Sequence, residues 1–184
     1  MTANNQRFLR PLAALAVALA LGGCFQPLYG SRPETGAAAS TQDALAGVDV
    51  AQIPATNGTA EARIAVETRN NLLFALSSGQ PPGAPTHQLR IRLTSTRLQV
   101  IVDVNTARPD VENYGLNATY DLVDMKTGKV VLKDQTFSRV SYDIPGQMQR
   151  FARERGLRDA ENRAAKTIAE SIRNRLASYF VAGT

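Results

Sequence analysis

Residues 114–122, YGLNATYDL, alternate apolar and polar or small side chains without a break. The apolar residues take the even positions throughout this stretch. Successive side chains of a strand point to opposite faces of a sheet, so this alternation is typical of a strand with one buried face. The stretch therefore predicts a sheet that is packed on one side and polar on the other.

The residues that follow predict a hairpin. Asp124 to Lys129 contains Thr127-Gly128, and glycine suits a turn position that needs a positive φ angle. Val130 to Tyr142 is then expected to return as the next strand. Turn and flanking strands together indicate an antiparallel pair.

A further strand precedes this pair. Its first apolar residues fall on odd positions, and they are Leu89, Ile91 and Leu93. Beyond Ser95 the apolar residues fall on even positions, beginning with Leu98. A bulge inserts one extra residue into a strand and would restore a single apolar face. We therefore predict a bulge between Thr94 and Leu98.

Two helices are expected, one before these strands in the sequence and one after them. Apolar residues at helical spacing predict one helix from Thr59 or Glu61 to Ser78, with Gly79 as its C-terminal cap. A longer amphipathic helix is predicted from about Gln147 to Phe180. Gly156 lowers the helix propensity of its first turns by about 1 kcal/mol relative to alanine.

The order of these elements defines the fold class. Val48 and Val50 give a short first strand signal ahead of the first helix. The order β-α-β-β-β-α predicts an α+β two-layer sandwich, with a four-stranded, mainly antiparallel sheet and two helices on one face. The opposite face should be in water or cover a partner. It would carry Arg90, Arg92, Asn117, Thr119 and Asp121.

The first 23 residues are typical of an export signal. Arg7 and Arg10 precede an apolar run from Leu12 to Leu21, and Gly22-Gly23-Cys24 follows. This ending resembles the lipobox of bacterial lipoproteins, in which the cysteine is acylated. We expect a covalent lipid on Cys24 that anchors the chain to a membrane, and no other cofactor. Phe25, in place of Asp after the cysteine, favours the outer membrane.

The rest of the chain is expected to form a tether and one domain. Residues 24–46 are predicted to be the lipidated N-terminus and a flexible tether, because 31–46 are rich in Gly, Ala, Ser and Thr. Residues 47–184 have the length of a single α+β domain. Cys24 is the only cysteine, so an intrachain disulfide is excluded.

The composition points to anionic partners in the cell envelope. The formal net charge is +5 and the sequence pI is about 9.7. Such a balance would ordinarily suggest nucleic-acid binding. An exported protein instead meets the phosphates and carboxylates of lipopolysaccharide and phospholipid headgroups, so we expect no nucleic acid partner.

Residues for catalysis are few. His87 is the only histidine, and no nucleophile motif accompanies it. Asp121 and Asp124 lie at strand ends or turns, where carboxylates are expected for local hydrogen bonding. One Cys and one His cannot supply a four-ligand Cys/His zinc site. We predict that the protein is not an enzyme; the alternative is an envelope hydrolase that depends on His87.

Basic residues crowd the start of the last helix. They are Arg150, Arg153, Arg155 and Arg158, and Arg108 lies in the loop before the central strand. The guanidinium group matches phosphate geometry with two parallel hydrogen bonds. This cluster is therefore a candidate site for the phosphates of lipid A. The alternative is ordinary surface charge in contact with water.

Three motifs resemble the LptE family of lipopolysaccharide-assembly lipoproteins, especially its alphaproteobacterial branch. CFQPLYG at 24–30 is similar to the family's Cys-Gly-Phe-x-Pro-Leu-Tyr start, although the glycine after the cysteine is absent. DMKTGK at 124–129 is similar to its third hairpin turn. Ser141-Tyr142-Asp143, with Phe151-Ala152 and the residues from Asp159 to Ala164, is similar to its strand-to-helix signature.

The resemblance implies the same β-α-β-β-β-α order. It also implies a partner, the outer-membrane β-barrel LptD, which the lipoprotein plugs and helps to assemble while the pair inserts lipopolysaccharide into the outer leaflet. By motif position, Arg108 and Arg153 are the implied lipopolysaccharide-binding residues, with Arg150 and Arg155 beside Arg153. The alternative function is an auxiliary lipoprotein of a phospholipid-transporting ABC system in the envelope.

Overall fold

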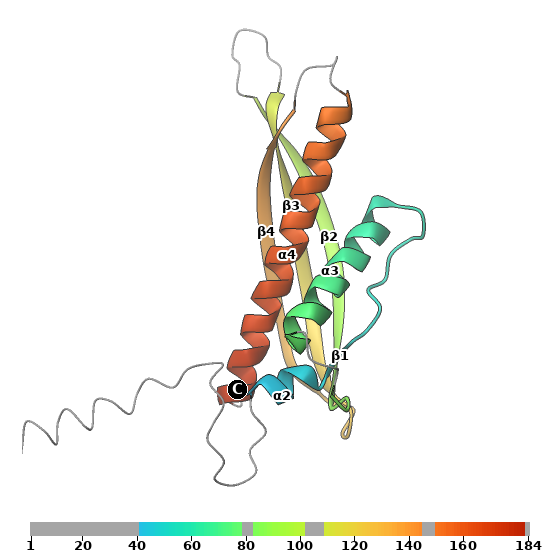
Figure 1. Cartoon of the computed structure of the whole chain (residues 1–184), viewed down its shortest axis with the longest axis vertical. Coiled ribbons are helices and arrows are strands. Elements are labelled where there is room, and N and C mark those ends of the chain that lie inside the picture. The colour runs from blue at the N-terminus through green and yellow to red at the C-terminus, as the bar shows by residue number, and fades with distance from the viewer. Residues whose placement is uncertain (1–40, 79–82, 102–108, 145–149, 183–184) are drawn as a thin grey trace, which may run out of the picture.

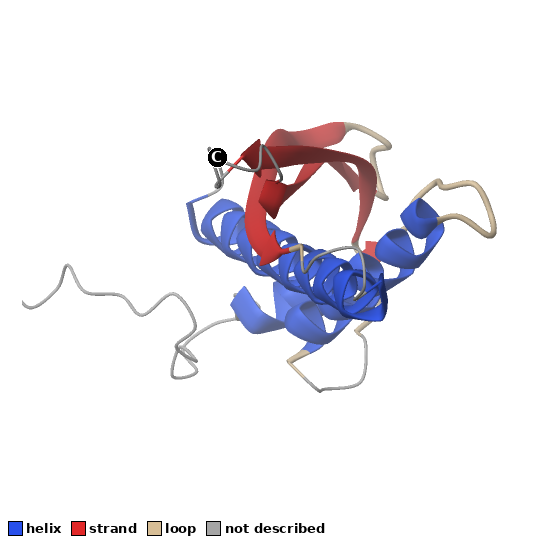
Figure 2. Ribbon diagram, turned by 90° about the horizontal axis from the view of Figure 1, so that it is seen from above, coloured by secondary structure: helices blue, strands red, loops and turns tan. Residues whose placement is uncertain are grey.

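The computed structural model describes residues 41–78, 83–101, 109–144 and 150–182. These residues form a four-stranded sheet with its helices on one side (Figures 1 and 2). In chain order the elements are α2 (Thr41–Ala46), β1 (Val48–Val50), α3 (Ala60–Ser77), β2 (His87–Ile101), β3 (Pro109–Asp124), β4 (Val130–Asp143) and α4 (Arg150–Ala182). The predicted α+β fold is confirmed, with one more short helix at its start.

The sheet has the strand order β1-β2-β3-β4. β1 runs parallel to β2, and the other two pairs are antiparallel. The predicted turn closes the β3–β4 hairpin. Asp124 Oδ1 accepts the backbone N–H of Lys126 at 2.7 Å, and Gly128 has a φ angle of 68°. Glycine is favoured there because a side chain would strain this conformation.

The predicted bulge between Thr94 and Leu98 is wrong. The register of β2 with β3 is continuous from His87 to Val100 and shifts only at Ile101. Leu98 instead lies on the side of the sheet away from the helices, with 65% of its surface exposed. The expectation failed because it assigned every apolar residue of the strand to the core.

Helix α3 begins and ends with backbone caps. The Thr59 hydroxyl accepts a hydrogen bond from Ala62 N–H at 3.2 Å, which satisfies a free donor of the first turn. At the other end Ser78 takes the left-handed conformation, with φ 50°, and donates its N–H to Phe74 O at 3.0 Å. Ser78 thus has the position expected of Gly79, which lies outside the described residues.

Helix α4 is continuous through Gly156. A Cβ atom on this residue would lie 3.3 Å from Cδ2 of the Tyr142 ring. Glycine therefore allows the helix to approach β4 closely at this point. The predicted apolar stripe is confirmed, because its inner residues are fully buried, namely Ala160, Ala164, Ile168, Ile172 and Leu176.

The core lies between the helices and the sheet. On the sheet side it contains the apolar residues of the central strand, namely Tyr114, Leu116, Ala118, Tyr120 and Leu122. Full burial of a Leu or Ile side chain stabilises a fold by about 1.5–3 kcal/mol. The alternation that predicted β3 therefore also identified the packed face.

Helix α2 lies within the predicted tether. Leu45 is only 1% exposed and joins the core, and the helix contacts both α3 and α4. Gly47 N–H continues the helical hydrogen bonds to Asp43 O at 3.0 Å. The folded part that the structure describes therefore begins at Thr41, before the predicted boundary at Gly47.

The domain is elongated (Figure 1). Strands β2 to β4 have 14 to 16 residues each, which at about 3.3 Å per residue corresponds to roughly 50 Å. We call the end with the β3–β4 turn, α2 and the end of α4 the lower end. The upper end is where β2 ends and β3 and α4 begin.

Candidate functional site

The basic candidates that the structure describes lie at the upper end. Arg150 is the first residue of α4, and only its backbone is described. The Arg153 side chain is 49% exposed and lies beside the sheet, whereas Arg155 is exposed. Residues two apart lie on different sides of a helix, so the structure does not bring Arg153 and Arg155 together. Arg108 and Cys24 lie outside the described residues.

Arg153 faces a buried carboxylate of the central strand. Glu112 is 4% exposed, and its Oε2 atom is 3.7 Å from Nη2 of Arg153. The same oxygen accepts a hydrogen bond from the Tyr142 hydroxyl at 2.5 Å. Transfer of an unpaired carboxylate from water to the protein interior costs roughly several kcal/mol of free energy. A buried carboxylate is therefore tolerated only with such partners.

This contact changes what Arg153 can do. Part of its charge is balanced by Glu112, so it presents less net charge to a ligand than its exposure suggests. Burial first, and then the hydrogen bond and charge of Glu112, raise the pKa of Tyr142 above the ordinary value. Tyr142 therefore stays protonated and keeps donating. Sequence spacing gave no sign of this cluster, since its members come from three separate elements.

A second buried carboxylate lies lower on α4. Glu161 is 2% exposed and forms an ion pair with Arg63 of α3. Burial and then the Glu161 charge raise the pKa of Tyr114 to about 12. Helices α3 and α4 are thus joined by a charged contact as well as by apolar packing.

The residues of the strand-to-helix signature come together at the junction of β4 and α4. Six of them line a hollow together with Gly156, and its cavity volume is about 520 Å³; the six are Ser141, Tyr142, Asp143, Ala152, Asp159 and Arg163. Arg163 donates to Asp159 Oδ2 at 2.7 Å and to Ser141 O at 3.4 Å. The first contact lies within α4, and the second joins the first half of that helix to the end of β4.

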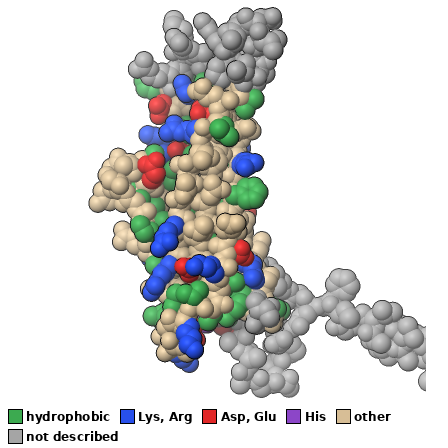
Figure 3. All heavy atoms as spheres, turned by 180° about the vertical axis from the view of Figure 1, so that it is seen from behind, with side chains coloured by type: hydrophobic (Ala, Val, Ile, Leu, Met, Phe, Trp, Pro, Cys, Tyr) green, Lys and Arg blue, Asp and Glu red, His purple; other side chains and the backbone are tan. Residues whose placement is uncertain are grey.

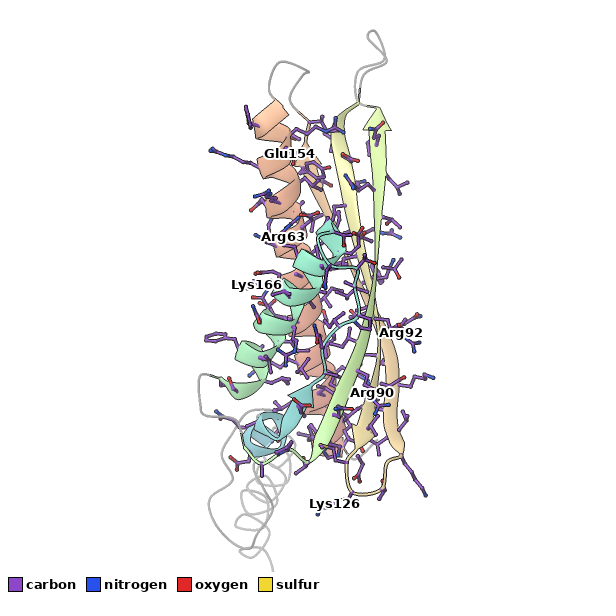
Figure 4. All side chains as sticks on the ribbon, turned by 90° about the vertical axis from the view of Figure 1, so that its right-hand side faces the viewer. Arg63, Arg90, Arg92, Lys126, Glu154 and Lys166 are labelled. Carbon is purple, nitrogen blue, oxygen red and sulfur yellow. The ribbon has the colours of Figure 1, made fainter. Side chains whose placement is uncertain are left out.

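A groove lies on the opposite face of the sheet, near the lower end. Its cavity volume is about 700 Å³, and it is lined by basic, acidic and amide side chains that include Arg90, Arg92, Asp121, Lys133 and Gln135. Arg90 and Arg92 point away from the helices (Figure 4). The alternation of β2 had placed both arginines on this face. Lys133 and Gln135 were not predicted there, although the alternation of β4 carries the signal.

His87 has packing contacts at the start of β2. Its ring lies edge-to-face against Phe180 with centroids 5.2 Å apart, and Nδ1 is 2.9 Å from the Thr86 hydroxyl. Nowhere in the described ranges do three His, Cys, Asp or Glu side chains gather closely enough to hold a metal ion. Among the same residues, no helix has the length and apolarity required to cross a membrane.

Fold and site together define a class of protein. The chain is a small α+β sandwich with a long sheet that is packed on one face, and exposed arginines lie at the start of α4. It matches the family model LptE, described as lipopolysaccharide-assembly, over residues 45–176. The match covers most of the chain, and the protein therefore belongs to the LptE family of lipopolysaccharide assembly.

Solved structures share the fold. A candidate lipoprotein from Caulobacter crescentus CB15 superposes with a TM-score of 0.60 at 20% identity, covering 78% of this chain and 97% of that one. The rare lipoprotein B of Shewanella oneidensis gives a TM-score of 0.53 at 13% identity, covering 73% and 96%. No curated protein matches the sequence significantly. At these identities the likeness concerns the fold alone.

Proposed function

We propose that the protein is a non-enzymatic outer-membrane lipoprotein, anchored by a lipid on Cys24. In this proposal it plugs and helps to assemble an LptD-type β-barrel, and takes part in binding lipopolysaccharide and inserting it into the outer leaflet. The family match over residues 45–176 is the observation that carries the proposal, because it includes the whole sheet and most of α4.

The dimensions of the domain support a role inside a barrel. Its strands extend for roughly 50 Å, and a bilayer with its headgroups is about 40–45 Å thick. Large outer-membrane barrels have polar interiors that can hold a plug. A polar, uncovered sheet face fits such an interior better than it fits lipid.

The upper end supports a role in lipopolysaccharide binding. Arg155 is exposed and Arg153 is half-exposed there, at the start of α4. Arginine binds phosphate groups with good geometry, and lipid A carries phosphates. Catalysis is not part of the proposal, because the matched family is one of lipopolysaccharide assembly and the His87 ring packs edge-to-face against Phe180.

Affinity purification of the tagged, lipidated protein from detergent-solubilised outer membrane tests the proposal. A single large barrel protein in equal amount is the expected result. Recovery of inner-membrane transporter subunits would instead support the auxiliary lipoprotein of a phospholipid-transporting ABC system. Recovery of neither would contradict both functions.

The assembly role has its own test. Depletion of the protein is expected to lower the amount of correctly assembled barrel in the outer membrane. If the barrel is equally abundant and correctly assembled after depletion, the plug and assembly role is wrong.

A further inference from the structure

We propose that the sheet face opposite the helices docks against the wall of the partner barrel, with Arg90 and Arg92 pairing with carboxylates of that wall. We call this surface the open sheet face. It consists of the even-numbered residues of β2 from Arg90 to Val100 and the residues of β3 and β4 that lie beside them. The identity of the partner rests on the proposed function; the choice of surface rests on the observations below.

The open sheet face has no cover in the described part of the chain. Figure 2 shows every described helix on the other side of the sheet, and Figure 3 looks directly onto this face. Three strands of this length, spaced about 4.8 Å apart, present roughly 700 Å². A standard interface buries about 800 Å² on each partner. The face is therefore large enough to form most of a stable interface.

Its centre has the composition of an interface. Phe137 of β4 is 65% exposed, and the Arg139 guanidinium lies 5.5 Å from the centre of its ring. Leu98, on β2, is also 65% exposed. Aromatic and arginine side chains are enriched in the cores of protein interfaces and contribute most of their binding energy. Phe137, exposed and in contact with the Arg139 guanidinium, is therefore suited to bind a protein partner.

The charges of the groove favour carboxylates as the partner groups. Among the described residues, no carboxylate forms a salt bridge with Arg90 or Arg92. Arg90 Nε donates only to the neutral amide oxygen of Gln88, at 3.0 Å. Basic side chains gather over the lower half of the face (Figure 3). Two guanidinium groups directed outward are therefore available to single carboxylates of a partner.

Asp121 argues against a phosphate ligand in the same groove. Its carboxylate lines the groove and lies 3.8 Å from Nζ of Lys133, which balances the charge of that lysine. A doubly charged phosphate would be repelled by Asp121. Separate carboxylates on a protein wall can instead face the two arginines, while amide or basic groups of the wall face Asp121.

The test uses the full-length, lipidated protein and compares recovery of the barrel. The variant R90E/R92E reverses both charges on the open sheet face. Its matched control, K126E/K166E, makes the same change in net charge at exposed positions of the β3–β4 turn and of α4, where Lys166 points away from the sheet (Figure 4). We expect R90E/R92E to lower barrel recovery by about tenfold or more and the control to leave it unchanged.

A second variant and a stability measurement keep the test independent of folding. Phe137→Ala is expected to lower barrel recovery as well, and its thermal unfolding midpoint should match that of the wild type, because the side chain is exposed. The midpoint of R90E/R92E should fall only slightly, because the new carboxylate at position 90 lies opposite Asp121 on an exposed face. If both variants recover as much barrel as the wild type, the docking surface is wrong and the proposed function stands. If the wild type recovers no barrel, the proposed function is wrong and this docking proposal is overturned with it.

A third measurement tests whether the groove at Arg90 and Arg92 binds phosphate instead of a protein wall. Titration of the wild type with inorganic phosphate should show no binding that R90E/R92E removes. Phosphate binding that is lost in R90E/R92E, together with unchanged barrel recovery, would overturn docking in favour of a ligand groove.

Discussion

Tyr142 donates a hydrogen bond to Oε2 of Glu112 across 2.5 Å, which joins β4 to β3 beneath the first turns of α4. Nη2 of Arg153 lies 3.7 Å from the same oxygen, so α4 is attached to the pair. One buried carboxylate thus organises the upper end of the sandwich. This relationship makes the upper end sensitive to small changes in polar groups.

Tyr142→Phe should lower the free energy of unfolding by about 1–2 kcal/mol. The substitution removes the donor while Glu112 stays buried, and an acceptor left unsatisfied costs about that much. Urea unfolding measures the effect. The control is Tyr179→Phe on α4, which is only partly buried and should change stability little. Equal effects of the two substitutions would contradict the role of the Glu112 contact.

Arg63→Ala should lower the free energy of unfolding by about 3 kcal/mol, because it leaves Glu161 buried without its cation. The double variant R63L/E161L should recover most of that loss, since replacing a buried ion pair by apolar residues is often neutral. Urea unfolding of the wild type, the single variant and the double variant measures both effects. A double variant less stable than R63A would show that the charged pair itself stabilises the fold.

Thr68→Val should raise the free energy of unfolding by up to about 1 kcal/mol. Thr68 is fully buried in α3, and its Oγ1 has no hydrogen-bond partner among the described residues. Replacing the hydroxyl by a methyl group of similar shape removes the cost of an unpaired polar atom. Thr68→Ser keeps the hydroxyl, loses a methyl and should destabilise. Thermal unfolding measures the expected order of stability, which is Thr68→Val above the wild type and Thr68→Ser below it. A Thr68→Val variant less stable than the wild type would show that the hydroxyl has a partner.

The fold was largely predictable because its packed faces repeat regularly. The alternation in β3 and the apolar stripe of α4 each mark a continuous buried surface, so periodicity alone located both elements. Helix α2 was missed, because a single large residue, Leu45, attaches it to the core. The false bulge in β2 arose from Leu98, an apolar residue on the open sheet face. Periodicity assumes that apolar residues are buried, and it fails where they serve an uncovered surface.

The candidate site was less predictable, since its contacts join residues far apart in sequence. Arg153 was identified from the crowding of arginines at the start of α4 and from its motif position, but the sequence did not show that Glu112, from another element, is its partner. The pairing of Arg63 with Glu161 was equally invisible. Sequence reasoning could recognise which residues carry charge, whereas only the structure shows which of those charges are already balanced.

Stability should fall as the pH rises from about 10 to 12. Burial raises the pKa of Tyr114 and of Tyr120 to about 12, with the charges of Glu161 and Asp134 adding to the effect. In the unfolded chain both tyrosines have a pKa of about 10. Above that pH the unfolded state therefore binds fewer protons than the folded state. The stabilisation is complete below pH 10 and lost by about pH 12.

Urea unfolding at several values between about pH 9 and 11 measures this slope. The variant Y114F/Y120F should show a shallower decline, because it removes two of the groups whose ionisation is disfavoured in the fold. An unchanged slope in that variant would assign the alkaline loss of stability to other groups.

Arg153 and Arg155 should differ in their effects on lipopolysaccharide binding, if the upper end binds lipid A phosphates as proposed. Arg155 is exposed, so Arg155→Ala should weaken binding by about two- to fivefold, as for an exposed ion pair, and leave stability unchanged. Arg153→Ala should weaken binding and also lower the free energy of unfolding by about 1 kcal/mol, since Glu112 loses a partner. Arg153→Lys keeps the charge and should restore stability, but only part of the binding, because lysine lacks the bidentate geometry.

Lipopolysaccharide titration and urea unfolding of the same preparations separate the two roles. If Arg155→Ala binds as well as the wild type while Arg153→Ala loses binding only in proportion to its unfolded fraction, the basic residues of α4 are surface and structural groups, and lipid A must contact another part of the protein.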